Sequence, residues 1–347
     1  MSLSLLVTGH DGYIGSVLVP LLLSAGHRVT GCDIGLYRKC SFLGELSEVE
    51  NLATDVRCLQ AKDLANIDAI IHLAGLSNDP LGSFRPQLTE EVNYKASLHL
   101  ANLAIDSGVE RFLFASSCSV YGNGSDDLLD EQSRTNPITP YARSKYQAEV
   151  DIALLANERF HPTFLRAGTV YGVSPRIRFD LVLNNLTAWA HASGKVHLKS
   201  DGNAWRPMLH VKDLAQAYLS ILEAPSKMVA GQAFNIGSTE QNFQIHELAS
   251  TVNLVLPQSK LEFATNAGAD FRNYRVNCDK FAELITARPM TWTIEDGVRE
   301  LAEALDLRPT TTGDIEGETF NRLTHIQALI RNGELTADLY WKTRSHE

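Results

Sequence analysis

The chain has 347 residues, of which 44% are hydrophobic, so it can bury a large core. Its formal net charge of −10 argues against nucleic acid or an anionic membrane as a partner, and an anionic ligand would have to be held by local arginines. The five cysteines form no CxxC pair and no histidine lies at zinc-like spacing, so neither a metal site nor a disulfide framework is predicted.

The N-terminal residues predict a strand, a glycine-rich turn and a helix. Ser4–Thr8 has the pattern of a short buried strand, and an apolar helical pattern then continues to Leu23. Between them, Gly9 allows a tight turn, Gly12 lets a pyrophosphate approach the backbone, and Gly15 lets the helix pack closely on the strand. The helix N-terminus adds N–H groups and a positive dipole. The spacing is GxxGxxG, so we predict a variant of the GxGxxG dinucleotide fingerprint.

The next apolar run, His27–Asp33, ends in a carboxylate about where a ribose-binding acid is expected. Asp33 would accept hydrogen bonds from the adenine ribose, and it would repel a 2′-phosphate. This favours NAD over NADP, although Arg38 is close enough in sequence to leave NADP open. Asp55–Val56 follows another apolar stretch and is expected to contact the adenine, with an ordinary loop carboxylate as the equal alternative.

Tyr141–Lys145 places a phenol and an ammonium four residues apart, which makes them neighbours on one face of a helix. Because an ammonium favours a nearby phenolate, we expect the pKa of Tyr141 to fall from about 10 toward the range of a general base. The same spacing also occurs on solvated helix faces, so the pattern gains its weight from the glycine turn and Asp33.

Alternating strand and helix patterns over the first half predict a parallel α/β sheet. No segment approaches the apolar length of a transmembrane helix, and no signal peptide precedes the first strand. We therefore expect a cytoplasmic protein with reduced thiols.

Several motifs in one order resemble those of the extended short-chain dehydrogenases/reductases, in the nucleotide-sugar epimerase and dehydratase group. Besides the glycine turn and Asp33, the matching segments are Ile70–Gly75, Asn93, Ser116–Gly122, Tyr141–Lys145, Leu165–Gly172, Arg206–Asp213 and Phe234–Gly237. The resemblance implies a Rossmann-type doubly wound parallel sheet with a smaller C-terminal substrate-binding α+β lobe, and NAD as the cofactor. We expect an NAD-binding domain over 1–172 with return elements around 207–240, a substrate-binding lobe over 173–206 and 241–306, and a C-terminal extension over 307–347 of unknown role.

The resemblance also implies the site residues. Tyr141 would be the catalytic base, Lys145 would lower its pKa and hold the nicotinamide ribose, and Ser117 would hydrogen-bond the sugar hydroxyl that is oxidised. Ser117 is chosen over Ser116 and Ser119 because the family's hydroxyl lies three residues before the Val of the VYG turn; a hydroxyl that caps its own backbone is the alternative. The implied cofactor-binding residues are Gly9, Gly12, Tyr13, Ile14, Gly15, Asp33, Asp55, Val56, Leu73, Ala74, Gly75, Asn93, Tyr141 and Lys145.

The two residues after Ser117 separate the subfamilies. Members resembling dTDP-glucose 4,6-dehydratase carry Asp and Glu there to remove water, and UDP-glucuronate decarboxylases commonly carry Glu at the second position, whereas this chain has Cys118 and Ser119. Relatives that use a cysteine for proton transfer at carbon also carry it at the second position. Cys118 would face the other side of a strand, so we expect it to be a buried small hydrophobe.

The chemistry that remains open to this chain needs only hydride transfer and the movement of one hydroxyl proton. Enzymes resembling UDP-glucose 4-epimerase use these two steps. We expect an NAD-dependent nucleoside-diphosphate-sugar epimerase that acts at C4 through a transient 4-keto intermediate. An NAD(P)-dependent nucleotide-sugar ketoreductase or dehydrogenase would use the same residues and release its cofactor in each cycle. Asp33 disfavours the NADPH that many such reductases prefer. A non-catalytic NAD-binding regulatory protein would usually lack the Tyr or the Lys.

For the substrate, the resemblance points to Arg206, Asp270 and Arg272, and the guanidinium fork of arginine suits a diphosphate. Thr169 stands where the family usually has an Asn that contacts the substrate phosphates, so the pocket can differ here. The two arginines of Ser174–Arg178 could compensate, or they could be solvated at the surface. The nucleotide and the sugar are not decided by these motifs.

Residues 307–347 continue beyond the usual end of the family. Phe320–Ile330 has a helical pattern in which Leu323, Ile326 and Leu329 predict an apolar face that packs on the body of the protein or on a second subunit. Many relatives dimerise through helices that here include the one carrying Tyr141, so we expect a homodimer.

Overall fold

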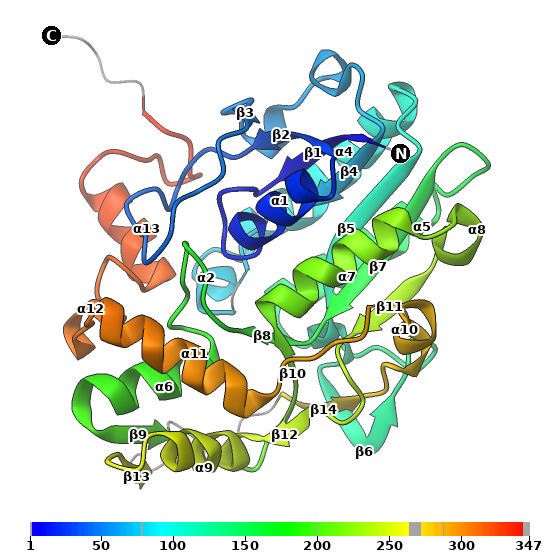
Figure 1. The fold of residues 1–347 in the computed structure, drawn as a ribbon. Helices are drawn as coiled ribbons and strands as arrows, with labels where there is room; N and C mark the ends of the chain where they lie inside the picture. The colour runs from blue at the N-terminus through cyan, green and yellow to red at the C-terminus, as the bar shows by residue number, and fades with distance from the viewer. Residues whose placement is uncertain (1, 78, 199, 264–271, 287, 343–347) are drawn as a thin grey trace, which may run out of the picture.

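The computed structural model describes residues 2–77, 79–198, 200–263, 272–286 and 288–342 of the chain. Its centre is a parallel sheet with the strand order β11-β7-β5-β4-β1-β2-β3 (Figure 1). These strands are β1 (Ser4–Thr8), β2 (Arg28–Cys32), β3 (Glu50–Asn51), β4 (Ala69–His72), β5 (Arg111–Ser117), β7 (His161–Ala167) and β11 (Ala233–Ile236). The chain builds outward from β1 to β2 on one side and from β4 to β5 on the other. A crevice for a ligand is therefore expected at the carboxyl ends of β1 and β4.

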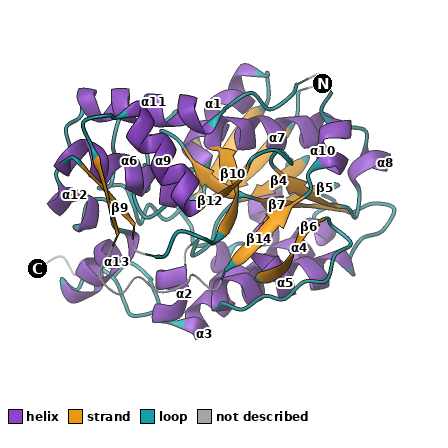
Figure 2. Cartoon of the chain, turned by 90° about the horizontal axis from the view of Figure 1, so that it is seen from below, coloured by secondary structure: helices purple, strands orange, loops and turns teal. Residues whose placement is uncertain are grey.

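Helices cover both faces of this sheet, as the view in Figure 2 shows. On one face lie α1 (Gly15–Ser24) and α7 (Val211–Glu223), and on the other lie α4 (Ala96–Asp106) and α5 (Pro140–Ala153). Strand β1 serves both cores, because Leu5 and Val7 pack in one apolar cluster and Leu6 packs in the other. All three side chains are fully buried, as expected for a central parallel strand. The predicted doubly wound α/β fold is confirmed.

A smaller group of elements packs beside the carboxyl ends of the strands. It contains β8 (Thr169–Tyr171), β10 (Trp205–His210) and β12 (Asn242–Gln244) in one sheet, β9 (Lys195–Leu198) paired with β13 (Lys260–Phe263), and β6 (Asn123–Leu129) paired with β14 (Asn273–Val276). Its main helices are α6 (Val182–Ser193), α9 (Ile245–Val255) and α11 (Ile294–Leu307). The shorter helices, which are spread over both parts of the structure, are α2 (Asp79–Phe84), α3 (Pro86–Glu90), α8 (Ser226–Val229), α10 (Asp279–Leu284) and α12 (Thr312–Glu316).

The C-terminal extension ends in α13 (Arg322–Arg331) and a short segment that reaches Lys342. Ile326 and Leu329 of this helix are buried, and they pack in a cluster with Leu76 and Leu81 of the body. The predicted apolar face of the extension is therefore confirmed. Within the described ranges, no helix combines the length and the apolar character needed to cross a bilayer.

A buried ion pair fixes α5 on the sheet. The carboxylate of Glu149 accepts hydrogen bonds from the guanidinium of Arg166 on β7 and, at 2.7 Å, from the hydroxyl of Ser116 on β5. These three residues are only 4–6% exposed. Arg166 also donates to the hydroxyl of Tyr121 at 2.9 Å and to the carbonyl of Glu131 at 3.2 Å. One helix and two strands are thus joined by groups that are costly to separate.

Replacing Glu149 by Gln keeps the size of the side chain and removes its charge, which leaves Arg166 as an uncompensated buried cation. We expect Glu149→Gln to lower the free energy of unfolding by about 3–5 kcal/mol in urea denaturation. The control is Glu90→Gln, because Glu90 pairs with Lys95 at an exposed site (3.2 Å), where a change within about 1 kcal/mol is expected. Equal effects of the two variants would contradict this role of the buried pair.

Candidate active site

The glycine turn between β1 and α1 can pack this tightly only because its glycines lack side chains. Gly9 has a φ of +73°, and a Cβ there would lie 2.8 Å from the backbone nitrogen of Ala74. A Cβ on Gly15 would lie 2.5 Å from the carbonyl oxygen of His10. The N–H of Gly12 donates to the carbonyl of Gly9 at 3.0 Å and closes the turn. The turn and the start of α1 therefore fit a pyrophosphate held by backbone N–H groups.

The base of this turn is tied to the loop that follows β8. The hydroxyl of Tyr13 donates to the carbonyl of Gly172 at 2.8 Å, and the hydroxyl of Ser174 donates to the carbonyl of Tyr13 at 2.8 Å. Ile14, the N-cap residue of α1, packs against the sheet core. Because the side chains of Tyr13 and Ile14 are engaged in this way, their contact with a cofactor would have to come from their backbone.

Asp33 follows β2, and its carboxylate accepts a hydrogen bond from the N–H of Gly35 at 2.7 Å. Burial raises the pKa of this carboxyl group above its usual value. Arg38 could have neutralised the charge of Asp33, but its Nε lies 3.9 Å from the carboxylate of Asp11. The carboxylate at this position therefore fits the ribose hydroxyls of NAD better than a 2′-phosphate.

Asp55 makes more contacts than the sequence indicated. Its two carboxylate oxygens accept from Nε and Nη2 of Arg57 at 2.9 and 2.7 Å, and one of them also accepts from the N–H of Arg57. Both side chains are only 10–12% exposed. Val56, which starts a short 3-10 turn, is buried. An adenine contact of Asp55 would therefore be shared with Arg57, which the sequence pattern did not single out.

Asn93 fastens the loop after β4 to the helix that carries Tyr141. It is fully buried, its Oδ1 accepts from the N–H of Leu76 at 2.7 Å, and its Nδ2 donates to the carbonyl of Leu76 and to the hydroxyl of Ser144. It lies in a π-helical turn, Glu91–Lys95, which the sequence did not predict and which is a feature common at functional sites.

The same loop approaches the site closely. The N–H groups of Leu73 and Ala74 donate to the backbone carbonyl and the hydroxyl of Thr8, at 3.0 and 3.2 Å. A Cβ on Gly75 would lie 3.0 Å from Oδ1 of Asn93 and 3.5 Å from Nζ of Lys145. Gly75 thus lets the backbone pass directly beside the lysine.

The three candidate catalytic side chains meet at the end of β5 and the start of α5. Thr139 caps this helix by accepting from the N–H of Ala142 at 3.1 Å, and Pro140 occupies its first turn. The side chain of Ser117 lies beside the hydroxyl of Tyr141 and acts to lower its pKa. Ser117 also accepts from the N–H of Ser119 at 3.1 Å, so it caps its own backbone and contacts the tyrosine as well.

Lys145 lies one turn further along α5 and is 3% exposed, with Nζ 4.7 Å from the centroid of the Phe114 ring. Burial lowers the pKa of Lys145 to about 8. Burial also raises the pKa of Tyr141 to about 12, while Arg178 and the hydrogen bond from Ser117 act in the opposite direction. The expected fall of the tyrosine pKa is therefore wrong for the protein by itself, because desolvation outweighs the nearby positive charge.

Two further polar residues near these strands have structural roles. His72 is fully buried between the hydroxyls of Thr8 (2.6 Å) and Ser97 (2.8 Å), and burial lowers its pKa to about 3, so it is neutral. Cys118 is fully buried, and its thiol donates to the carbonyl of Arg166 at 3.1 Å. The prediction that Cys118 is a buried small side chain is confirmed.

The predicted substrate contacts are only partly assembled. Nη1 of Arg206 donates to the carbonyls of Trp205 (2.7 Å) and Arg272. Arg272 reaches across to Asp79 of α2, with Nη1 2.7 Å from the carboxylate. Thr169 lies in β8 opposite Met208. Asp270 lies outside the described residues.

Arg176 and Arg178 are not solvated at the surface, so that alternative is wrong. They are 4% and 8% exposed. Nε of Arg176 donates to the carbonyl of Asp11 in the glycine turn at 3.2 Å. Arg178 pairs with Asp180 and donates to the hydroxyl of Ser77 at 3.0 Å, and its charge acts on Tyr141. Arg178 therefore belongs to the surroundings of the candidate base.

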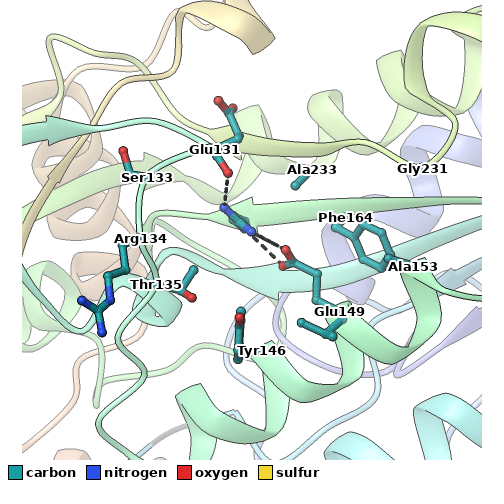
Figure 3. Close-up of a pocket in the computed structure, with 12 residues that line it drawn as sticks. Glu131, Ser133, Arg134, Thr135, Tyr146, Glu149, Ala153, Phe164, Gly231 and Ala233 are labelled. Carbon is teal, nitrogen blue, oxygen red and sulfur yellow. Dashed lines mark hydrogen bonds and ion pairs between the residues drawn. The ribbon is translucent and has the colours of Figure 1, made fainter.

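A cavity of about 460 Å³ lies between α5, β7 and β11, but it does not include the candidate catalytic residues (Figure 3). Tyr146 and Glu149 of α5 line one side, and Phe164 and Arg166 of β7 line another. The buried charges of this cavity are those of the ion pair that fixes α5. We therefore assign it no catalytic role. In the described part of the chain, no His, Cys, Asp and Glu side chains are grouped to hold a metal ion.

The chain is similar to known enzymes that act on nucleotide sugars. A UDP-glucuronate 4-epimerase from Thermodesulfobacterium geofontis (strain OPF15) is 26% identical over 313 residues, which are 85% of this chain and 93% of that protein. A dTDP-D-glucose 4,6-dehydratase from Mus musculus is 24% identical over 318 residues, covering 86% and 87%. The structure of MoeE5 in complex with UDP-glucuronic acid and NAD has a TM-score of 0.76 and 25% identity, covering 88% of this chain and 99% of that one.

The family model for the NAD-dependent epimerase/dehydratase family matches residues 5–237, which contain the glycine turn, Asp33, Ser117, Tyr141 and Lys145. NAD is the cofactor of this family, and the turn and Asp33 fit it. This chain is a member of the NAD-dependent epimerase/dehydratase family.

Proposed function

We propose that this protein is an NAD-dependent nucleoside-diphosphate-sugar epimerase that inverts C4 through a transient 4-keto sugar. The observation that carries the proposal is that Ser117 acts on the hydroxyl of Tyr141, with buried Lys145 one helical turn away. A relative of similar length is a UDP-glucuronate 4-epimerase, which supports the same chemistry.

In the proposed mechanism, Ser117 orients the C4 hydroxyl of the sugar by a hydrogen bond, and Tyr141 accepts the proton from that hydroxyl. When bound, NAD supplies the hydride acceptor for C4 and, once reduced, the hydride donor. The Lys145 ammonium favours the phenolate form of Tyr141, whose pKa of about 12 must be lowered for this step. The 4-keto sugar then rotates, so that hydride returns to the opposite face of C4. Tyr141 gives its proton back to the oxygen at C4.

The residues after Ser117 argue against loss of water from the sugar. Elimination needs an acid and a base beside the sugar ring, and burial raises the pKa of the Cys118 thiol far above neutrality. Ser119 has no group that ionises in this range. Cys118 and Ser119 therefore provide no acid and base for loss of water, which leaves proton and hydride transfer at one carbon.

For the substrate we propose that Arg206 and Arg272 hold the diphosphate. Arg272 is 38% exposed and pairs with Asp79, so a phosphate would compete with that carboxylate. In this proposal residues 1–172 and 207–240 bind NAD, while residues 173–206 and 241–306 hold the nucleotide sugar. UDP-sugars are the first candidates, because UDP-glucuronate is named for the relative and for the solved structure.

Replacing Tyr141 by Phe removes only the hydroxyl that takes the proton. We expect Tyr141→Phe to lower kcat by about 10²–10⁴-fold, with the content of bound NAD unchanged. Turnover is followed by NMR of the sugar H4 signal with UDP-glucuronate or UDP-glucose. The control is Tyr146→Phe, five residues further along α5 in the wall of the cavity in Figure 3, which should keep its activity. Undiminished turnover of Tyr141→Phe would remove the proposal.

The lowered pKa of Lys145 predicts how activity depends on pH. Its ammonium is present below a pH of about 8 and is lost as the pH rises through this value, so kcat should fall between pH 8 and 10. A pH–rate profile at constant ionic strength tests this, with circular dichroism at each pH to check the fold. A rate that stays constant up to pH 10 would show that the charge on Lys145 is not required.

We also propose a homodimer formed through the outer faces of α4 and α5. Val150 lies on α5 and Leu154 directly follows this helix, one turn later; they are 37% and 79% exposed. Light scattering should give twice the mass of one chain, and Leu154→Glu should shift the protein to the monomer. Leu254→Glu, at another exposed leucine on α9, is the control and should leave the dimer intact. A monomeric wild-type protein at micromolar concentration would refute the dimer.

A further inference from the structure

The C-terminal extension crosses the loops that follow β2, β3 and β4. In Figure 1, α13 lies beside the blue loop after β2, although the two are almost 300 residues apart in sequence, as the 289-residue separation of Leu36 and His325 shows. In a doubly wound sheet, loops at the carboxyl ends of these strands surround the bound dinucleotide. The extension therefore lies over one half of the cofactor site.

The extension contacts the loop after β2 at two places, through His325 and through Trp341. A ring nitrogen of His325 is hydrogen-bonded to the carbonyl of Leu36 at 2.9 Å. The indole N–H of Trp341 donates to the carbonyl of Ile34 at 2.7 Å, and Ile34 directly follows the ribose-binding candidate Asp33. Any outward movement of Asp33 and its neighbours would have to break these contacts.

The turn after β3 is held through Arg57. Its Nη1 donates to the carbonyl of Asp338 at 3.0 Å, and its Cζ lies 3.9 Å from the centroid of the Tyr340 ring. The same guanidinium is bound by both oxygens of Asp55, the candidate adenine contact. A stack of Tyr340 on Arg57 therefore supports the carboxylate of Asp55 through the guanidinium that it binds.

The loop after β4 is held by apolar contacts. The cluster that joins it to the extension contains Leu76, Leu81, Leu88, Ile326, Leu329, Leu335 and Leu339, all at most 5% exposed. Arg85 adds a hydrogen bond to the carbonyl of Ala337 and an ion pair with Asp338 at 3.3 Å. Three separate loops are thus bound to one continuous segment.

We infer that residues 322–341 complete the adenosine side of the cofactor site and slow the release of NAD. For adenosine to leave, the loops after β2 and β3 must separate, and the extension joins them through Trp341, Tyr340 and Arg57. NAD would then stay bound through many turnovers, as an enzyme that reoxidises its own cofactor requires. The inference depends on the family's use of NAD and is independent of the sugar chemistry.

The test is the rate of NAD release from the full-length protein. The double variant Tyr340→Ala/Trp341→Ala removes two side chains that are 40% and 42% exposed, so the buried cluster of α13 is kept. We expect NAD to dissociate about tenfold faster than from the wild type, because lost contacts act mainly on dissociation rates. Release is measured without any sugar, by adding an excess of NAD glycohydrolase that destroys free NAD. Met228→Ala, at an exposed position on α8, is the control and should release NAD at the wild-type rate.

Hydrogen exchange of the wild-type protein provides a second readout that does not depend on a variant. NAD should slow the exchange of backbone amides in residues 334–342, measured by mass spectrometry on the protein with and without bound NAD. An unchanged dissociation rate in the double variant, or unchanged exchange in this segment, would overturn the inference. Neither result would bear on whether the enzyme is an epimerase.

Discussion

The buried ion pair between Glu149 and Arg166 is the interaction on which the candidate active site depends. It joins α5 to β7, and Ser116 joins the same carboxylate to β5. Ser117 follows Ser116 directly, and Tyr141 precedes Glu149 by about two turns of α5, so one network fixes the strand and the helix that carry these two candidate residues. The position of the candidate base Tyr141 is therefore supported by groups outside the candidate catalytic set.

The glycine turn, Asp33 and the extension are related by a similar constraint. A parallel sheet brings the ends of its strands to one edge, and this edge must admit a dinucleotide while keeping water away from the reacting carbon. Gly9 and Gly15 allow the close backbone packing of the turn, and the loop after β8 closes the base of the turn through Tyr13. The extension covers the remaining loops through Trp341 and Tyr340.

Much of the fold and of the catalytic group could be predicted from the sequence, because these signals are local. Glycine spacing, apolar runs and the four-residue interval from Tyr141 to Lys145 each reflect one turn or one helix. The pairing of Arg57 with Tyr340 and the burial of Arg178 could not be predicted, since both depend on contacts between distant segments. The raised pKa of Tyr141 could not be predicted either, because desolvation depends on the whole surrounding core.

The proposed epimerase keeps one NAD and uses it repeatedly at a single carbon of a nucleotide sugar. The most direct test is to denature freshly purified protein and identify the small molecules that it releases by mass spectrometry. We expect about one NAD per chain, with or without a nucleotide sugar. An empty site, or NADPH in place of NAD, would contradict it and would favour a reductase that exchanges its cofactor in every turnover.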